Sequence, residues 1–204
     1  MNILNIENIS KIYGEKVIFD HASFGIQEGD KIGIIGINGT GKTTLLKMAA
    51  GLEEPDEGQI IKQNNLRIAY LPQNPQFPEN ATILSYIQDS EQQWKIESNL
   101  NKLGILEYDT PIEYLSGGQR QRMTIARAVV KKPDILILDD SASALDFATD
   151  AKLRMAIRDM ENKATVFIVS QRAASIMYAD KIIVLDDGQI VGMGTHEELL
   201  KQCE

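Results

Sequence analysis

Short runs of apolar residues alternate with segments of helical spacing along most of the chain. The runs KIGIIGI (31–37), DILILD (134–139), ATVFIVS (164–170) and KIIVLDDG (181–188) have the length of strands and are largely apolar. Continuous apolar character is typical of strands that are buried on both faces. The alternation of such strands with helical segments predicts an α/β fold.

A more polar segment, about residues 77–115, lies between the first two runs. It contains ILSYI and WKIESNLNKLGIL, in which the apolar residues have helical spacing. We predict that it forms a small helical subdomain inserted into the α/β core of one domain, residues 1–204. Near the end, THEELL places Thr195 three residues before Glu198, a capping box that predicts a short last helix.

Composition and charge narrow the class of protein. The chain has 204 residues, of which 43% are hydrophobic and 25% charged, as in ordinary globular proteins. Its formal net charge of −8 disfavours loose binding to nucleic acid or anionic lipid. The single cysteine, Cys203, favours a reducing compartment. The N-terminus does not resemble a signal peptide, and no apolar run approaches the roughly 20 residues that cross a bilayer.

A glycine-rich stretch, GINGTGKTT, begins at Gly36 and is followed by the helical pattern LLKMAAGL. It fits the phosphate-binding motif GxxxxGKS/T in the required strand–loop–helix order. Gly36, Gly39 and Gly41 let backbone N–H groups close around phosphates. Lys42 would contact the β- and γ-phosphates, and Thr43 would bind Mg²⁺. A glycine-rich turn with a surface lysine is the alternative, which the agreement of motif and context disfavours. We also assign Asn38, Thr40 and Thr44 to nucleotide binding.

The stretch LSGGQRQR, beginning at Leu115, has the pattern of a helix start. Ser116 can cap the helix, and Gln119 stands in the capping-box position three residues later. Gly117 and Gly118 leave the first amides of the helix uncovered, which favours an anion. Taken alone, this stretch predicts a capped helix and nothing more.

Together, GINGTGKTT, LSGGQRQR and ILILDD resemble the ATP-binding cassette (ABC) family over essentially the whole chain. The resemblance implies a P-loop NTPase core of ABC type, with the inserted helical subdomain and an N-terminal antiparallel β part. It also implies that the ligands are ATP and Mg²⁺.

The resemblance further assigns three residues outside the glycine-rich loop. Tyr13 in ISKIYGEKVIF matches the aromatic residue that stacks on adenine. Gln73 in YLPQNP matches the glutamine that senses Mg²⁺ and the γ-phosphate, and Asp139 matches the Mg²⁺-associated carboxylate. From their surroundings alone, Tyr13 could also be an edge-strand tyrosine, and Gln73 a turn glutamine beside Pro72.

In this family two cassettes close head to tail, and each ATP lies between the phosphate loop of one and the LSGGQ of the other. Ser116, Gly117, Gly118 and Gln119 would therefore serve the nucleotide of the partner, and Asp146 in SALD matches the loop that crosses the interface. One chain would hold two half-sites, so a lone monomer should turn over poorly. The implied partners are a second cassette and a transmembrane domain on another chain.

Two residues depart from the pattern of fully hydrolytic members. The residue after Asp139, a glutamate in those members, is Asp140. Its side chain is one methylene shorter, roughly 1.5 Å of reach, and a displacement of about 1 Å can slow a reaction on the order of a hundredfold. The expected histidine in VFIVSQR is Gln171, which carries no charge near neutral pH. Drift could explain Asp140 alone. With both catalytic positions changed, we expect weak hydrolysis.

The same two departures, with an intact LSGGQ, resemble the degenerate half of heterodimeric ABC exporters. QIVGMGTHEELLKQCE also resembles the end of an exporter cassette. The part before LSGGQ instead resembles the ABC-F type, soluble cassettes that act on the ribosome, and its helical insertion is short for an exporter. Natural divergence or a chimera would explain this mixture, and we favour the chimera.

Two functions follow from these resemblances. The favoured one is the nucleotide-binding part of an ABC transporter, which would be cytoplasmic and peripheral at the inner face of the membrane. The alternative is a soluble ABC-F-like ATPase that acts in translation. ABC-F proteins normally carry two cassettes joined by a charged linker, which this sequence lacks, and a net charge of −8 is unfavourable for binding ribosomal RNA.

Overall fold

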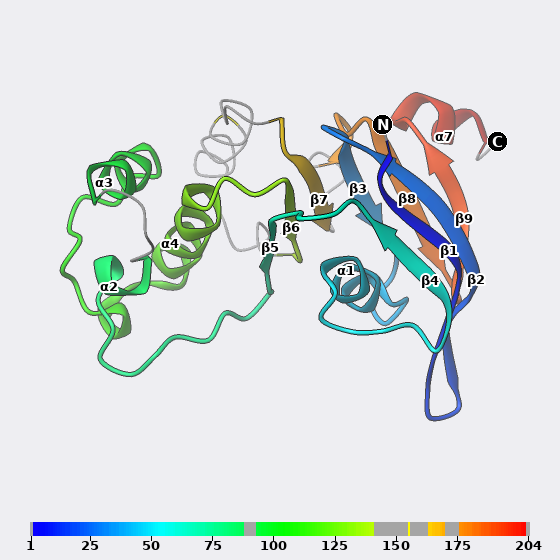
Figure 1. Cartoon of the computed structure of the whole chain (residues 1–204), viewed down its shortest axis with the longest axis horizontal. Coiled ribbons are helices and arrows are strands. Elements are labelled where there is room, and N and C mark those ends of the chain that lie inside the picture. The colour runs from blue at the N-terminus through cyan, green and yellow to red at the C-terminus, as the bar shows by residue number, and fades with distance from the viewer. Residues whose placement is uncertain (1, 88–92, 141–154, 156–162, 170–175, 203–204) are drawn as a thin grey trace.

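Two β-sheets and a group of helices make up the computed structural model, which describes residues 2–87, 93–140, 155, 163–169 and 176–202 (Figure 1). One sheet has three strands, in the order β2-β1-β4, and the other has six, in the order β5-β6-β7-β3-β8-β9. The helices α2, α3 and α4 lie at one end of the molecule and the three-stranded sheet lies at the other (Figure 1).

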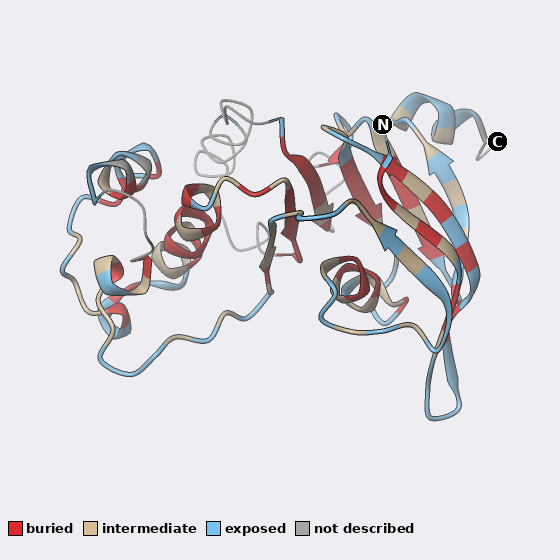
Figure 2. Cartoon of the chain, viewed as in Figure 1, coloured by how far each residue is buried: buried red, intermediate tan, exposed pale blue. Residues whose placement is uncertain are grey.

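The six-stranded sheet confirms the predicted α/β fold. Neighbouring strands from β5 to β8 pair in parallel, and β9 pairs with β8 antiparallel at the edge. All four residues of β6 are buried, and so are most of β7 beside it and the middle of β3 beyond it (Figure 2). The strands are β3 (Lys31–Ile35), β5 (Ile68–Leu71), β6 (Ile135–Leu138), β7 (Thr165–Val169), β8 (Lys181–Asp186) and β9 (Gln189–Gly194).

The N-terminal antiparallel part is also present. Strand β1 (Asn2–Tyr13) pairs on one side with β2 (Lys16–Gln27) and on the other with β4 (Glu57–Lys62). The tight turn between β1 and β2 sits at the tip of an exposed hairpin (Figures 1 and 2). Tyr13, the last residue of β1, therefore lies at the rim of the molecule.

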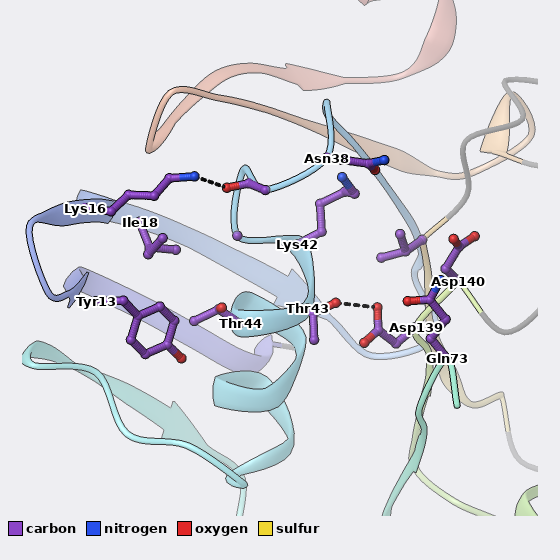
Figure 3. A pocket seen from close by; sticks show the side chains of 13 residues that line it. Tyr13, Lys16, Ile18, Asn38, Lys42, Thr43, Thr44, Gln73, Asp139 and Asp140 are labelled. Atoms are coloured by element: carbon purple, nitrogen blue, oxygen red, sulfur yellow. Dashed lines mark hydrogen bonds between the residues drawn. The ribbon is translucent and has the colours of Figure 1, made fainter. Parts of the chain in front are cut away.

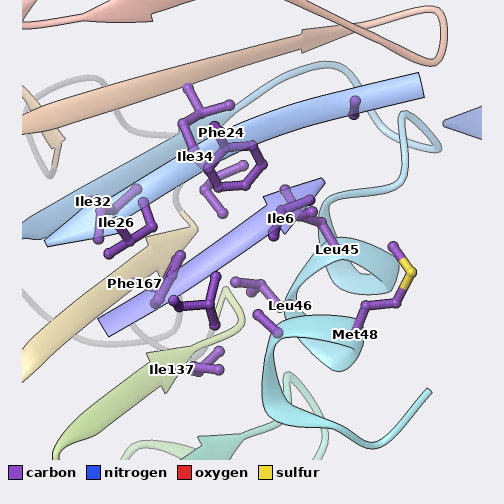
Figure 4. Packing of buried hydrophobic residues seen from close by; sticks show 14 of the residues in the cluster. Ile6, Phe24, Ile26, Ile32, Ile34, Leu45, Leu46, Met48, Ile137 and Phe167 are labelled. Carbon is purple, nitrogen blue, oxygen red and sulfur yellow. The ribbon is translucent and has the colours of Figure 1, made fainter. Parts of the chain in front are cut away.

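The main hydrophobic core joins the two sheets through the helix α1 (Lys42–Ala50). Leu45, Leu46 and Met48 of α1 are at most 1% exposed, and Figure 4 shows Leu45 beside Ile6 of β1. Burying such a side chain contributes about 1.5–3 kcal/mol. The packing of α1 thereby fixes the loop that connects β3 to its first residue, Lys42.

A second core lies in the helical part, where α4 packs against α3, α2 and β5. Within the predicted range 77–115 are α2 (Ile83–Ile87), α3 (Gln93–Lys102) and the 3₁₀ turn η1 (Ile112–Tyr114). Helix α4 (Gly117–Val130) follows directly. The limits of the subdomain stay a prediction, because α4 shares this core while leading back to β6.

The last helix, α7 (His196–Gln202), begins with the predicted capping box. The backbone N–H of Thr195 donates to the carboxylate of Glu198 at 2.7 Å, and the N–H of Glu198 donates to the Thr195 hydroxyl at 3.3 Å. None of the described helices combines the length and the apolar character that a membrane crossing requires.

Candidate functional site

A cavity of about 490 Å³ opens where the carboxyl ends of β3 and β6 meet α1 and the tip of the β1–β2 hairpin (Figure 3). Ligands of open α/β sheets bind at such carboxyl ends. The cavity brings together most of the residues predicted for ATP and Mg²⁺: Tyr13, Asn38, Gly39, Gly41, Lys42, Thr43, Thr44, Gln73, Asp139 and Asp140. Gly36 and Thr40 belong to the same loop, and Thr40 lines an adjoining cavity of about 270 Å³.

The glycine-rich loop needs its glycines for conformation and for space. Gly39 and Gly41 have φ angles of 86° and 93°, a backbone region that other residues rarely adopt. A Cβ atom on Gly41 would lie 2.5 Å from Cγ2 of Ile18, so the loop packs directly against β2. A Cβ atom on Gly36 would lie 2.5 Å from the carbonyl oxygen of Leu185. The loop therefore lies between β2 and β8, with its backbone toward the cavity.

Two ammonium groups lie along the loop. The Lys42 Nζ donates to the carbonyl oxygens of Gly36 and Ile37, both at 2.7 Å. The Lys16 Nζ reaches over from β2 and donates to the carbonyl oxygen of Gly39 at 3.0 Å (Figure 3). Burial lowers the pKa of Lys42 below its usual 10.5, and the Asp140 and Asp139 carboxylates oppose that shift. A polyphosphate in this cavity would supply the negative charge that such a half-buried ammonium lacks.

The carboxylate of Asp139 is 3% exposed and is held by two hydroxyl groups. The Thr43 hydroxyl donates to Oδ1 at 3.0 Å, and the Tyr70 hydroxyl donates to Oδ2 at 2.8 Å. Gln73 lines the same end of the cavity. These residues fit Mg²⁺, because a hydroxyl, a carboxylate and an amide offer the oxygen ligands that this hard cation prefers.

The neighbouring acid, Asp140, is 8% exposed and has a φ angle of 48°. Among residues with a side chain, aspartate and asparagine adopt positive φ most readily. The backbone turn after β6 therefore gives a conformational reason for aspartate here, besides any change in catalysis. Gln171, the second catalytic position, lies outside the described residues, as does Asp146.

At the other end of the cavity the Tyr13 ring is 48% exposed (Figure 3). Its hydroxyl donates to the Glu53 carboxylate, which raises the tyrosine pKa. The Nζ of Lys11 lies 5.6 Å from the ring centroid. The hydrogen bond to Glu53 thus holds the ring at its hydroxyl end, and the ring still lines the cavity. An aromatic ring at one end, with cations and oxygen ligands toward the other, suits a nucleoside triphosphate.

The LSGGQ residues stand apart from this cavity, at the start of α4 in the helical part. Ser116 and Gln119 form the predicted capping box: the Gln119 N–H donates to Ser116 Oγ at 3.3 Å, and the Ser116 N–H donates to Gln119 Oε1 at 2.9 Å. A Cβ atom on Gly117 or Gly118 would meet nothing within 4 Å. Packing against the described residues therefore requires neither glycine.

Sequence reasoning missed four residues around the site. Lys16 and Ile18 line the cavity beside Tyr13, Val169 lines it at the end of β7, and Tyr70 holds Asp139 from β5. Lys16 and Ile18 are two residues apart, and this spacing places both side chains on one face of a strand. That spacing, just after the turn that follows Tyr13, is the signal that could have identified them.

The chain matches a family described as ABC transporter over residues 19–143. It is 36% identical to an uncharacterized ABC transporter ATP-binding protein, YfmR of Bacillus subtilis, over 73% of this chain and 31% of that protein. It is 34% identical to a probable sulfate/thiosulfate import ATP-binding protein, CysA of Chlorella vulgaris, over 98% of this chain and 93% of that protein. The chain thus spans about a third of one relative and most of the other.

Among solved structures, a bacterial Atm1-family ABC exporter with ATP bound is similar, with a TM-score of 0.90 and 27% sequence identity. The similarity covers 98% of this chain and 40% of the exporter chain. The match to CysA likewise covers 98% of this chain, across the point where the sequence resemblance changes. These similarities give no support to a chimeric origin or to an ABC-F-like N-terminal part.

Proposed function

The chain belongs to the ABC transporter family of ATP-binding proteins, and from that premise we propose that it binds MgATP in the described cavity and pairs head to tail with a second cassette. The observation that carries this proposal is the cavity itself. It places the Tyr13 ring, the glycine-rich loop and the Asp139 carboxylate along one path, although Tyr13 and Asp139 lie 126 positions apart in the sequence.

Each group has a physical role in holding the nucleotide. The Tyr13 ring offers a face for adenine, and the loop amides with the Lys42 ammonium face the phosphates. The Thr43 hydroxyl and the Asp139 carboxylate would hold Mg²⁺, with Gln73 beside them. Oγ1 of Thr43 and Oδ1 of Asp139 are 3.0 Å apart. When bound, Mg²⁺ neutralises charge on the phosphates. Ser116 to Gln119 lie apart from this path and would act on the partner's nucleotide.

Hydrolysis at this site should be weak. Asp140 lines the cavity next to Asp139, but its carboxylate stands on a side chain one methylene shorter than the glutamate of fully hydrolytic members. Its positive φ angle of 48° sets the direction of the Cα–Cβ bond from which that short side chain extends. We propose that Asp140 and Gln171 leave ATP bound for longer between the two cassettes.

The head-to-tail arrangement is supported by the surface at the start of α4. An added Cβ on Gly117 or Gly118 would have no described residue within 4 Å, so an external partner would account for two adjacent glycines. A nucleotide phosphate approaching from a second chain would reach the first amides of α4 through this open space.

ATP with Mg²⁺ is therefore expected to convert wild-type monomers into dimers, measured as a doubling of mass by light scattering. The matched variant Gly118→Leu should fold, bind ATP and remain monomeric, because its side chain would project into space that is open among the described residues and that the proposed partner would occupy. Replacing a helical glycine should also stabilise α4, by about 1 kcal/mol at most. A wild type that stays monomeric at saturating ATP and high protein concentration contradicts the homodimer, unless a different cassette restores pairing.

We also propose that the second partner is a transmembrane domain on another chain, with this chain at the cytoplasmic face of the membrane. The names of YfmR and of the similar exporter refer to ABC transport, and that of CysA refers to sulfate/thiosulfate import. None of them supports the ABC-F alternative. Co-purification with a membrane domain would support the transport role. Co-sedimentation with ribosomes, without any membrane partner, would favour the alternative.

A further inference from the structure

Tyr70 lies on β5, beside the strand that ends at the proposed Mg²⁺ site. Strands β5 and β6 pair in parallel, with Tyr70 opposite Ile137 and Leu71 opposite Leu138. The backbone N–H of Asp139 then donates to the carbonyl oxygen of Leu71 at 3.0 Å. This register brings the Tyr70 hydroxyl to 2.8 Å from Oδ2 of Asp139.

We propose that Tyr70 is a positioning residue for Mg²⁺, which holds Oδ2 of Asp139 so that Oδ1 faces Thr43 and the metal. This inference rests on the proposed MgATP site and adds a residue to it. Tyr70 does not line the cavity, so its effect on a ligand there would pass through Asp139.

Each of the two hydroxyl donors, Thr43 and Tyr70, binds a different oxygen of the Asp139 carboxylate. The final torsion of an aspartate side chain is broad and roughly two-fold, so the side chain alone does not fix which oxygen faces the cavity. Thr43 has one proton, and donating it to Oδ1 leaves the oxygen lone pairs of Thr43 available to a cation. Tyr70 fixes the other oxygen and leaves Oδ1 and the Thr43 oxygen side by side.

The hydrogen bond from Tyr70 matters because the Asp139 side chain is buried. Asp139 is 3% exposed, so little water is available to replace a lost donor. The phenol of tyrosine is an ordinary hydrogen-bond donor, and here its O–H donates to Oδ2 of Asp139. Strand β5 also ends two residues before Gln73. The hydrogen bond from Tyr70 to Asp139 therefore links the segment that leads to Gln73 with the end of β6.

The variant Tyr70→Phe removes the hydroxyl and keeps the ring. We expect it to weaken ATP binding in the presence of Mg²⁺ by about three- to tenfold, which is less than the full effect of one hydrogen bond to a charged group because Tyr70 acts only through Asp139. ATP binding in EDTA should be unchanged, because the loop and Lys42 are untouched. Calorimetry measures both affinities, and Mn²⁺ affinity of the ATP complex, followed by electron paramagnetic resonance, gives an independent reading of the metal.

The matched control is Tyr108→Phe, which removes a hydroxyl bonded to Asn101 Oδ1 at 2.7 Å in the helical part. It should leave both ATP affinities and the Mn²⁺ affinity unchanged. An equal loss of affinity with and without metal in Tyr70→Phe would overturn the proposal, because a general loosening of the fold acts on both. If Tyr70→Phe binds ATP in the presence of Mg²⁺ as tightly as the wild type does, the proposal is overturned as well.

A double-mutant cycle with Asp139→Asn tests whether Tyr70 acts through that carboxylate. In the Asp139→Asn background, Tyr70→Phe should cause no further loss of metal affinity, whereas independent effects would multiply. Multiplying effects would contradict the proposal. Failure of the MgATP site as a whole is a separate result, because the wild type would then bind no ATP.

Discussion

Replacing Lys42 with alanine is expected to weaken MgATP binding by about ten- to a hundredfold or more. The Lys42 ammonium donates to the loop carbonyl oxygens of Gly36 and Ile37 and lines the cavity together with Asp139 and Asp140. Losing a hydrogen bond to a charged group costs about 1.5–3 kcal/mol, and each 1.4 kcal/mol is about a tenfold change in affinity. Calorimetric titration with MgATP measures the loss directly.

Lys62 offers a matched control for that experiment. It is also half-buried, and burial also lowers its pKa, but it lies on β4 and does not line the cavity. Lys62→Ala should bind MgATP as the wild type does. If Lys42→Ala also binds as tightly as the wild type, the phosphate site does not lie in this loop.

Restoring both catalytic side chains is expected to raise turnover well beyond the product of the single effects. Asp140→Glu lengthens the acid by one methylene, and Gln171→His returns a group that can hold the γ-phosphate and the acid in register. Residues that act as a unit are strongly non-additive, so each single variant should gain little. ATP affinity should change little, because Lys42 and Asp139 are retained.

Steady-state phosphate release, at protein concentrations that allow dimers, measures this effect. The melting temperature of each variant should be recorded in parallel, because glutamate at the 48° φ angle of residue 140 carries a conformational cost that aspartate avoids. A wild type that already turns over near the usual enzyme median of about 10 s⁻¹ contradicts the degenerate site. So does a double variant that dimerises normally and is no faster than the wild type.

The fold could be predicted where a local pattern was strong. The apolar run DILILD predicted a buried strand, and all four residues of β6 are buried. The glycine-rich loop could be predicted equally well, because its residues are contiguous in the sequence and the helix follows directly after them. The Ser116 capping box was also predicted, since it needs only Ser116 and a glutamine three residues later.

The parts of the site that depend on strand pairing could not be predicted in this way. Tyr70 reaches Asp139 only because β5 pairs with β6 in one register, and no local pattern specifies that partner. Lys16 reaches Gly39 because the glycine-rich loop packs against β2, and the same packing excludes a side chain from Gly41. The role of Tyr13 came from family resemblance, since its spacing alone fits an edge strand.

Single-turnover ATP hydrolysis as a function of protein concentration, with molecular mass determined in parallel, tests most directly whether two chains share each nucleotide. Because Ser116 lies apart from the cavity of its own chain, we predict that the rate per chain rises with concentration as dimers form. It should then level off far below about 10 s⁻¹. A rate per chain that is independent of concentration, in a sample that remains monomeric, would contradict the account.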